Sequence, residues 1–276
     1  MAKKVRQEVM RSSDLELDHM RHSCSHMLAQ AVLEMFPDAK LGIGPTTDDG
    51  FYYDFDLPRT LIPEDLDLLQ EKMERISKEK QTFRRIESKV EKAIDFYKKV
   101  KQPYKVDLIE GLKKEGEKVI TFYENIDNDG TLKFSDLCRG GHSEDTGKTG
   151  AFKLTKIAGA YWRGDEKQPM LQRIYGICFK DGKALRTHLA MMEEAKKRDH
   201  RKLGQELDLF VFSDLVGAGL PLWTPKGTVI RNILDDYVWA LRKERGYEKV
   251  TIPHITKKDL YETSGHWQKF ADDLFR

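Results

Sequence analysis

Two short histidine-containing motifs in this sequence could carry chemistry. His22 and His26 are four residues apart in a helical pattern, so both imidazoles lie on one face, one turn apart. Cys138 and His142 flank a glycine pair, which lets the backbone fold back and point both side chains the same way. Three imidazoles and one thiol suit tetrahedral zinc; the same set could instead hold a substrate and a water molecule without metal.

A cysteine protease is a poor explanation of this set. Its nucleophile and base usually come from distant segments with a third orienting group, whereas Cys138 and His142 share one short loop. The other cysteines, Cys24 and Cys178, fall in apolar patterns and are predicted to be buried as small hydrophobic residues. Three cysteines make no disulfide framework, which is typical of a reducing compartment and predicts a cytoplasmic location.

Composition narrows the class of protein. The chain has 276 residues, 39% of them hydrophobic and 34% charged, with a net charge of only +2. These values exclude wholesale disorder, and they exclude a strongly basic arm as the main device for gripping nucleic acid. No stretch approaches the roughly 20 apolar residues needed to span a membrane. We therefore expect about two domains and no membrane partner.

The elements expected to position the two motifs mix helix and strand. Helical periodicity begins at Asp14, with Asp18 predicted as the N-cap, and ends at Pro37. The turn at 48–50 is predicted to need a positive dihedral angle at Gly50. β-Branched and aromatic runs separated by glycines predict a mainly antiparallel sheet and an α+β fold class. Further helices are predicted over 63–80 and 91–101, and strands over 41–45, 51–56, 83–90, 119–123, 132–137, 152–158, 161–163 and 172–179.

The composition changes after residue 182. A charged segment over 183–203 predicts a linker helix, whose basic end could contact nucleic-acid phosphates or form a solvated face. A Gly/Pro-rich turn leads into a predicted helix over 228–245 and a strand over 249–253. The apolar face of that helix is too broad for one narrow stripe, which predicts a partner surface.

Longer motifs around these residues closely resemble bacterial threonyl-tRNA synthetases. The resembling segments of the editing domain are 22–28, 42–45, 50–54, 136–142, 159–165 and 170–176. Residues 198–204 are similar to the family's link into its catalytic domain, and 228–253 to motif one of class II synthetases. The alanyl-tRNA synthetase editing domain shares the His and Cys pattern but lacks this continuation, so the threonyl family is the better match.

The resemblance implies a domain order. It gives a tail over 1–13, an editing (second additional) domain over 14–182, the linker helix over 183–203, and over 204–276 the N-terminal part of the class II catalytic domain. The chain lacks the family's small preceding domain and stops before motifs two and three and the catalytic-domain zinc ligands. ATP, that zinc and homodimer formation are therefore expected of the full-length enzyme, and only deacylation of mischarged tRNA of this chain alone.

The implied activity is hydrolysis of seryl-tRNA(Thr), while the full-length enzyme ligates threonine to tRNA(Thr) using ATP. Serine lacks one methyl group of threonine, a difference worth only about 1–3 kcal/mol in a pocket, so accuracy requires a second, hydrolytic site. The residues that match the family's editing site are His22, His26, Lys105, Asp136, Cys138 and His142.

The resemblance implies a role for several of these residues. His22 or His26 would hold or activate water. Lys105 would stabilise charge near the ester or the terminal ribose, and Asp136 would orient Lys105 or the substrate amine. The family usually has proline where this chain has Gly141, which predicts a less rigid loop. Two alternatives remain: a free-standing hydrolase that clears mischarged tRNA in trans, and a non-catalytic, zinc-stabilised RNA-binding module.

Overall fold

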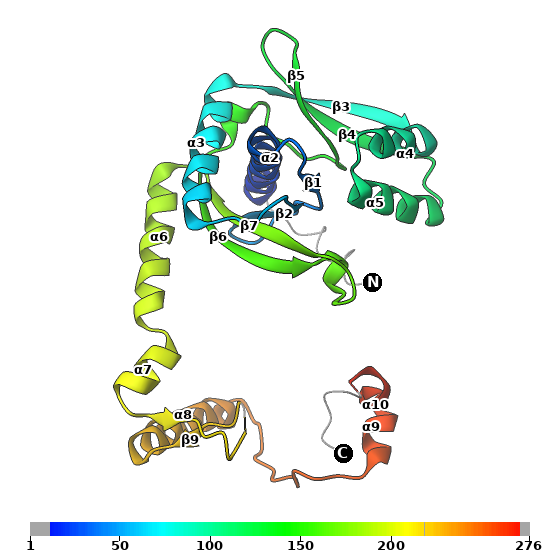
Figure 1. Ribbon diagram of the computed structural model, residues 1–276. Coiled ribbons are helices and arrows are strands. Elements are labelled where there is room, and N and C mark those ends of the chain that lie inside the picture. The colour runs from blue at the N-terminus through cyan, green and yellow to red at the C-terminus, as the bar shows by residue number, and fades with distance from the viewer. Residues whose placement is uncertain (1–11, 218, 271–276) are drawn as a thin grey trace. The chain divides into compact units, whose positions relative to one another are not determined.

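The computed structural model describes residues 12–217 and 219–270, so most of the predicted tail over 1–13 lies outside the described residues. The chain divides into two compact units, one ending at Glu193 and the other beginning at Glu194. All paired strands are antiparallel and are combined with helices, which confirms the α+β fold class (Figure 1). The strands of the first unit are β1 (Lys40–Leu41), β2 (Gly50–Asp56), β3 (Thr82–Lys89), β4 (Val119–Ile126), β5 (Leu132–Leu137), β6 (Ala151–Tyr161) and β7 (Met170–Phe179).

Helix α2 (Ser12–Met35) lies between the two sheets of the first unit (Figure 1). One sheet has the strand order β1-β2-β7-β6 and the other has the order β3-β4-β5. The helix is buried on all sides from Ser23 to Val32, because both sheets and helix α3 (Pro63–Glu79) pack against it. It begins at Ser12, so the prediction of Asp18 as the N-cap is wrong; Asp18 lies within the helix.

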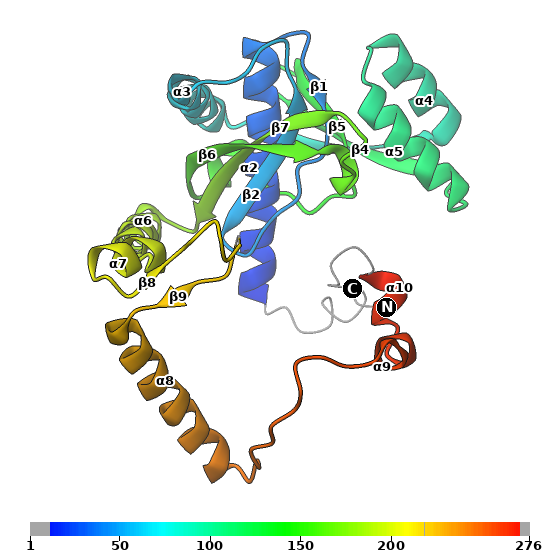
Figure 2. The ribbon, with the colours of Figure 1, turned by 60° about the horizontal axis from the view of Figure 1, so that its bottom comes forward.

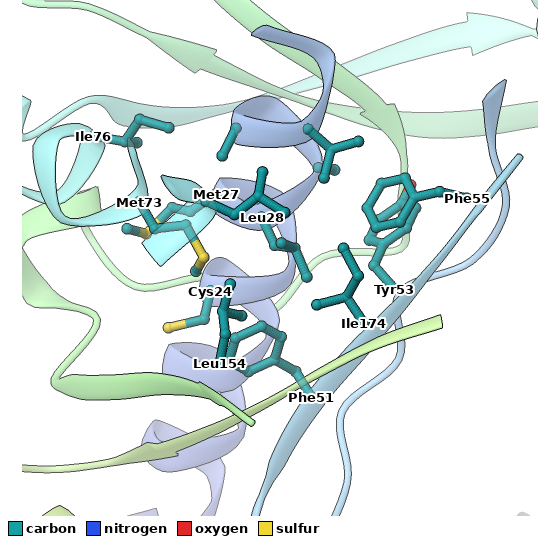
Figure 3. Packing of buried hydrophobic residues seen from close by; sticks show 14 of the residues in the cluster. Cys24, Met27, Leu28, Phe51, Tyr53, Phe55, Met73, Ile76, Leu154 and Ile174 are labelled. Atoms are coloured by element: carbon teal, nitrogen blue, oxygen red, sulfur yellow. The ribbon is translucent and has the colours of Figure 1, made fainter. Parts of the chain in front are cut away.

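The main core forms where α2 meets β2, β7 and α3. Figure 3 shows Met27 and Leu28 of α2 close to Met73 of α3, with Tyr53 and Phe55 on the other side. Side chains at every second position of β2 face α2 because successive residues of a strand point to opposite faces. The rings of Tyr53 and Phe55 stack with centroids 4.8 Å apart. Burial of each such side chain contributes about 2 kcal/mol, which fixes β2 against the helix.

The sheet β3-β4-β5 is covered on its other face by helices α4 (Val90–Lys99) and α5 (Pro103–Lys114). Figure 2 shows these two helices side by side at the edge of the unit. Helix α5 was not predicted from the sequence, although Pro103 at its first position is a common start signal. It matters for the site because it carries Lys105.

Glycine at position 50 serves a different purpose from the one predicted. The φ angle of Gly50 is not positive; the residue is the first of β2 and pairs with Ile177 of β7. A Cβ there would collide with the carbonyl oxygen of Gly176. The glycine is therefore required by the close approach of β2 and β7, not by the turn.

Two further predictions are wrong in detail. Residues 161–163 are not a separate strand: β6 runs to Tyr161 and is followed by a short 3-10 helix, η2 (Trp162–Gly164). The linker predicted as one helix over 183–203 is interrupted between α6 (Gly182–Lys197) and α7 (His200–Glu206). The Asp199 carboxylate accepts a hydrogen bond of 2.8 Å from the amide of Arg201, so it caps α7 and favours a new helix start.

The second unit contains a short hairpin and three further helices. Its central helix α8 begins at Thr224, whose hydroxyl accepts a hydrogen bond of 3.2 Å from the amide of Gly227. The strand predicted over 249–253 is wrong, because no other segment of the described chain pairs with it and its side chains are exposed. The elements are β8 (Phe210–Val211), β9 (Leu222–Trp223), α8 (Pro225–Glu244), α9 (Lys258–Thr263) and α10 (His266–Lys269).

Among the described residues, no helix combines the length and apolar character that crossing a bilayer requires.

Candidate active site

The structure brings the two histidine-containing motifs together. The ligand atoms of His22, His26, Cys138 and His142 all lie within 4.8 Å of one another. α2 supplies the first two residues, and the loop after β5 supplies the other two. The sulfur of Cys138 is 3.3 Å from Nε2 of His22 and 3.3 Å from Nε2 of His142. We refer to these four residues as the His/Cys cluster.

The tautomer of His22 is fixed by a backbone contact. Its Nδ1 lies 3.2 Å from the carbonyl oxygen of Gly141. A carbonyl oxygen only accepts, so Nδ1 carries the proton and Nε2 presents its lone pair to the thiol of Cys138. The amide of Gly140 donates to the same sulfur at 3.2 Å. The turn between Cys138 and His142 therefore orients both an imidazole and a thiol.

His142 is enclosed by rings and one hydroxyl. Its ring stacks on Phe83 with centroids 4.6 Å apart and lies 4.6 Å from the ring of Tyr123. Ser23 Oγ is 3.2 Å from its Nδ1 and accepts a hydrogen bond of 2.9 Å from the amide of Ser143. Sequence reasoning missed Ser23, Phe83 and Tyr123 as site residues. The position of Ser23 beside His22 was the available signal.

Burial keeps the His/Cys cluster neutral. Desolvation lowers the pKa of His22, lowers that of His26 well below its usual value, and lowers that of His142 to about 2. Burial also raises the pKa of the Cys138 thiol to about 12. At neutral pH the cluster therefore offers unprotonated imidazole nitrogens, which can accept a proton or bind a metal ion.

The donor set fits zinc. Tetrahedral bonds of about 2.0 Å to nitrogen and about 2.3 Å to sulfur place those two atoms about 3.5 Å apart, close to the separations in the cluster. Nδ1 of His26 is buried without a hydrogen-bond partner among the described residues. A bound ion or water in the cluster would compensate for such an unpaired buried nitrogen.

Lys105 and Asp136 form a second, fully buried group. Lys105 Nζ lies 2.5 Å from Asp136 Oδ1, and the two side chains are only 2% and 4% exposed. Tyr53 joins them: its hydroxyl donates to Asp136 Oδ2 and accepts from Lys105 Nζ at 2.9 Å. We call these three residues the Lys–Asp–Tyr group. It lies close enough for Asp136 and Lys105 to affect the charge states of His22 and His26.

Sequence reasoning placed Lys105 and Asp136 at the site but missed Tyr53. The reason is that Phe51, Tyr53 and Phe55 alternate as an ordinary core-facing strand does. The signal that could have found it is the phenol itself, because a buried tyrosine hydroxyl usually has a hydrogen-bond partner. Cys24 and Cys178 are fully buried in the core, as predicted, and both sulfurs donate to the carbonyl of Thr149.

A pocket of about 450 Å³ adjoins the His/Cys cluster at Cys138. Its walls are partly apolar, with Leu112 and Ile120 among them, and Arg139 and Arg163 also line it. Arg163 is held by an ion pair of 3.1 Å to Asp107. The pocket therefore combines apolar surface with two guanidinium groups beside the cluster.

The chain resembles known proteins over nearly its whole length. Residues 120–175 match the family described as "Threonyl and Alanyl tRNA synthetase second additional domain". A threonine--tRNA ligase of Dehalococcoides mccartyi is 49% identical over 95% of this chain and 43% of its own length. Ligases of the same name from Gloeobacter violaceus and a Mycobacterium species are 47% and 48% identical, over 99% and 93% of this chain and 43% and 38% of their own lengths. The chain thus spans about two fifths of these relatives.

Proposed function

The chain belongs to the threonine--tRNA ligase family over the part of those proteins that it spans, and we propose that its residues 14–182 edit mischarged tRNA. The reaction would be hydrolysis of the ester of seryl-tRNA(Thr). The observation that carries the proposal is the convergence of the His/Cys cluster within 4.8 Å, beside an open pocket. An aminoacyl ester is activated, so a positioned water, a proton acceptor and a stabiliser of the oxyanion suffice.

We assign proton transfer to His22. Its Nδ1 donates to the carbonyl of Gly141, so the lone pair of Nε2 faces the cluster. Without a metal, that nitrogen would accept a proton from the attacking water and return it to the ribose oxygen as the ester bond breaks. Free serine and tRNA would be the products. The lowered pKa of His22 keeps the imidazole unprotonated at neutral pH, as a general base requires.

Lys105 is proposed as a stabiliser of charge, not as a carrier of protons. Its ammonium is held at 2.5 Å by Asp136 and at 2.9 Å by Tyr53. Because these partners fix it, the positive charge cannot swing into solvent, and it can act on a developing oxyanion without reorganisation. Asp136 would orient Lys105, and it also lies two residues before Cys138, so the same contact holds the start of the cluster loop.

The pocket beside Cys138 supports tRNA as the partner. Apolar walls can bind a nucleobase, and the guanidinium groups of Arg139 and Arg163 can contact phosphate or ribose oxygens. Since Cys138 belongs to both the pocket and the cluster, a tRNA 3′ end in the pocket would bring its ester to the histidines.

Zinc would be held by the His/Cys cluster. If three of the four side chains bound it, the remaining position would take water, whose pKa zinc lowers to about 7. A closed four-ligand site would instead make the metal structural, as in a zinc-stabilised RNA-binding module. Chelation separates these outcomes, because it unfolds a domain with a structural metal but leaves a catalytic domain folded.

The activity of a whole ligase is a further proposal. Its ATP-dependent charging of tRNA(Thr), its catalytic-domain zinc and its homodimer would require segments beyond those in this chain. The exposed apolar face of α8 supports dimerisation: Ile233 is 62% exposed and Leu234 58% exposed. Ile233→Asp should weaken concentration-dependent association in sedimentation experiments. A free-standing editor is less well supported, because similarity to ligases extends through the second unit.

Deacylation by the 276-residue chain tests the main proposal. Seryl-tRNA(Thr) should lose its serine faster than threonyl-tRNA(Thr) loses its threonine, and His22→Ala should remove the difference. The exposed His200, with its side chain 83% accessible, provides a matched control, and His200→Ala should retain the activity. Equal rates for the two substrates, or full activity in His22→Ala, would contradict the assignment.

A further inference from the structure

An aromatic ring packs against each glycine of the turn in the His/Cys cluster. Gly140 and Gly141 have φ angles of +101° and +86°, a left-handed backbone that side-chain-bearing residues rarely adopt. A Cβ at Gly140 would overlap the hydroxyl of Tyr123. A Cβ at Gly141 would lie 2.9 Å from Cδ2 and 3.0 Å from Nε2 of His19. His19 has no part in the proposed reaction.

His19 is well placed to act on this turn. It lies on α2 three residues before His22, so the two imidazoles share one face of the helix. Its side chain is half-buried, and its ring occupies the space that a side chain at Gly141 would fill. A proline could not adopt the backbone of Gly141, because its ring fixes φ near −65°. Rings from α2 and β4 thus fill the space beside a turn that has no side chains of its own.

The backbone of this turn sets the chemistry of the cluster. The carbonyl of Gly141 accepts from Nδ1 of His22 at 3.2 Å, and the amide of Gly140 donates to Cys138 Sγ at 3.2 Å. A shift of the turn would release the first contact and let the His22 proton move to Nε2. The imidazole would then lack its lone pair on the side that faces the thiol.

We propose that His19 and Tyr123 are positioning residues that clamp the Gly140-Gly141 turn and thereby hold His22 in its Nδ1–H tautomer. The effect on rate rests on the proposed editing function, whereas the effect on the tautomer does not. The clamp needs the ring of His19 but not its proton chemistry. His19→Phe should therefore preserve function, and His19→Ala should not.

Nitrogen NMR of the His22 imidazole in the 276-residue chain reads the tautomer directly. The wild-type chain and His19→Phe should show protonated Nδ1 and unprotonated Nε2; His19→Ala should show a mixture. In deacylation assays His19→Ala should lower kcat about 10- to 100-fold with little change in KM, because small misplacements at a reacting centre have effects of this size. An unchanged tautomer in His19→Ala, or equal losses in both variants, would overturn the clamp.

A matched pair of glycine variants separates ring contact from backbone strain. Gly141→Ala adds a Cβ against His19, whereas Gly130→Ala adds one at a φ of +85° with no atom within 4 Å. Gly141→Ala should change the His22 tautomer and lower kcat; Gly130→Ala should change neither. Removing the ring in a Gly141→Ala/His19→Ala double variant should make the alanine less harmful than it is alone, and strict additivity would overturn the proposal. Should the wild-type chain not deacylate seryl-tRNA, the editing function fails while the tautomer measurement still decides the clamp.

Discussion

The two polar groups inside the first unit differ in how completely they are paired. Lys105 and Asp136 bind each other at 2.5 Å, and Tyr53 contacts both. The His/Cys cluster, by contrast, leaves Nδ1 of His26 without a partner among the described residues and presents weakly bonded nitrogens to a thiol. Both groups are buried, so burial alone does not distinguish a structural group from a reactive one. Incomplete pairing does, because an unpaired buried nitrogen is costly and remains available to a ligand.

The largest expected effect is on stability, in the Lys–Asp–Tyr group. Lys105→Met keeps the stem but leaves the Asp136 carboxylate buried without its cation, which should lower the free energy of unfolding by about 3–5 kcal/mol. Denaturant unfolding measures this loss. The exposed pair of Lys40 and Asp56, with side chains 43% and 35% accessible, is the control: Lys40→Met should cost less than about 1 kcal/mol. Similar losses in both variants would abolish the distinction between a buried structural pair and a surface pair.

The next effect is on rate, in the His/Cys cluster. His22→Ala should slow deacylation of seryl-tRNA at least about 100-fold, as expected for loss of a general base, while the free energy of unfolding changes less than in Lys105→Met. Single-turnover assays together with denaturant unfolding test both halves. A variant that keeps its rate but loses stability would assign His22 to the structural group.

Stability should also fall in mild acid because of the cluster. An unfolded histidine binds a proton with a pKa near 6.5, whereas burial keeps the pKa of His26 well below that value and the pKa of His142 at about 2. The unfolded state therefore binds more protons below pH 6.5, and each histidine should cost about 1.4 kcal/mol per pH unit. Unfolding at pH 6.5 and 5.5 measures the slope, and His142→Gln should reduce it. A slope that His142→Gln leaves unchanged would show that His142 is protonated in the folded chain.

The smallest effect is expected at Ser23. Ser23→Ala removes the contacts to His142 Nδ1 and to the amide of Ser143, and should cost about 1 kcal/mol of stability together with a modest loss of rate. Ser25 is an equally buried control, since its hydroxyl donates to the carbonyl of His22 within the helix. Ser25→Ala should leave the rate unchanged. A slower Ser25→Ala variant would mean that the packing of α2, and not the hydroxyl of Ser23, sets the position of His142.

The convergence of the His/Cys cluster could be anticipated from the sequence because its constraints are local. A four-residue spacing on a helix and a glycine pair between Cys138 and His142 each predict two side chains on one side. The contacts that complete the site are not local. Tyr53 reads as an ordinary core residue until β2 is placed opposite β5, and Phe83 becomes a site residue only when β3 packs beside α2.

The errors in the predicted elements also have physical reasons. The strand over 249–253 has β-branched residues but no partner among the described residues, and isolated strand propensity does not form a sheet. The linker helix was predicted from charge and spacing, but Asp199 supplies a cap that ends one helix and begins another. Lys105 looked like a solvated lysine because the helix start at Pro103 was overlooked.

The contact between His22 and Gly141 joins residues 119 positions apart, and this separation has a consequence for synthesis. At about 5–20 residues per second, a ribosome takes roughly 6–24 s to make the second half of the site after the first. During that interval α2 has emerged without the two sheets that later enclose it, and a largely apolar helix with two potential metal-binding histidines is exposed. Chaperone capture and premature metal uptake would therefore act on this helix first, before any other part of the site exists.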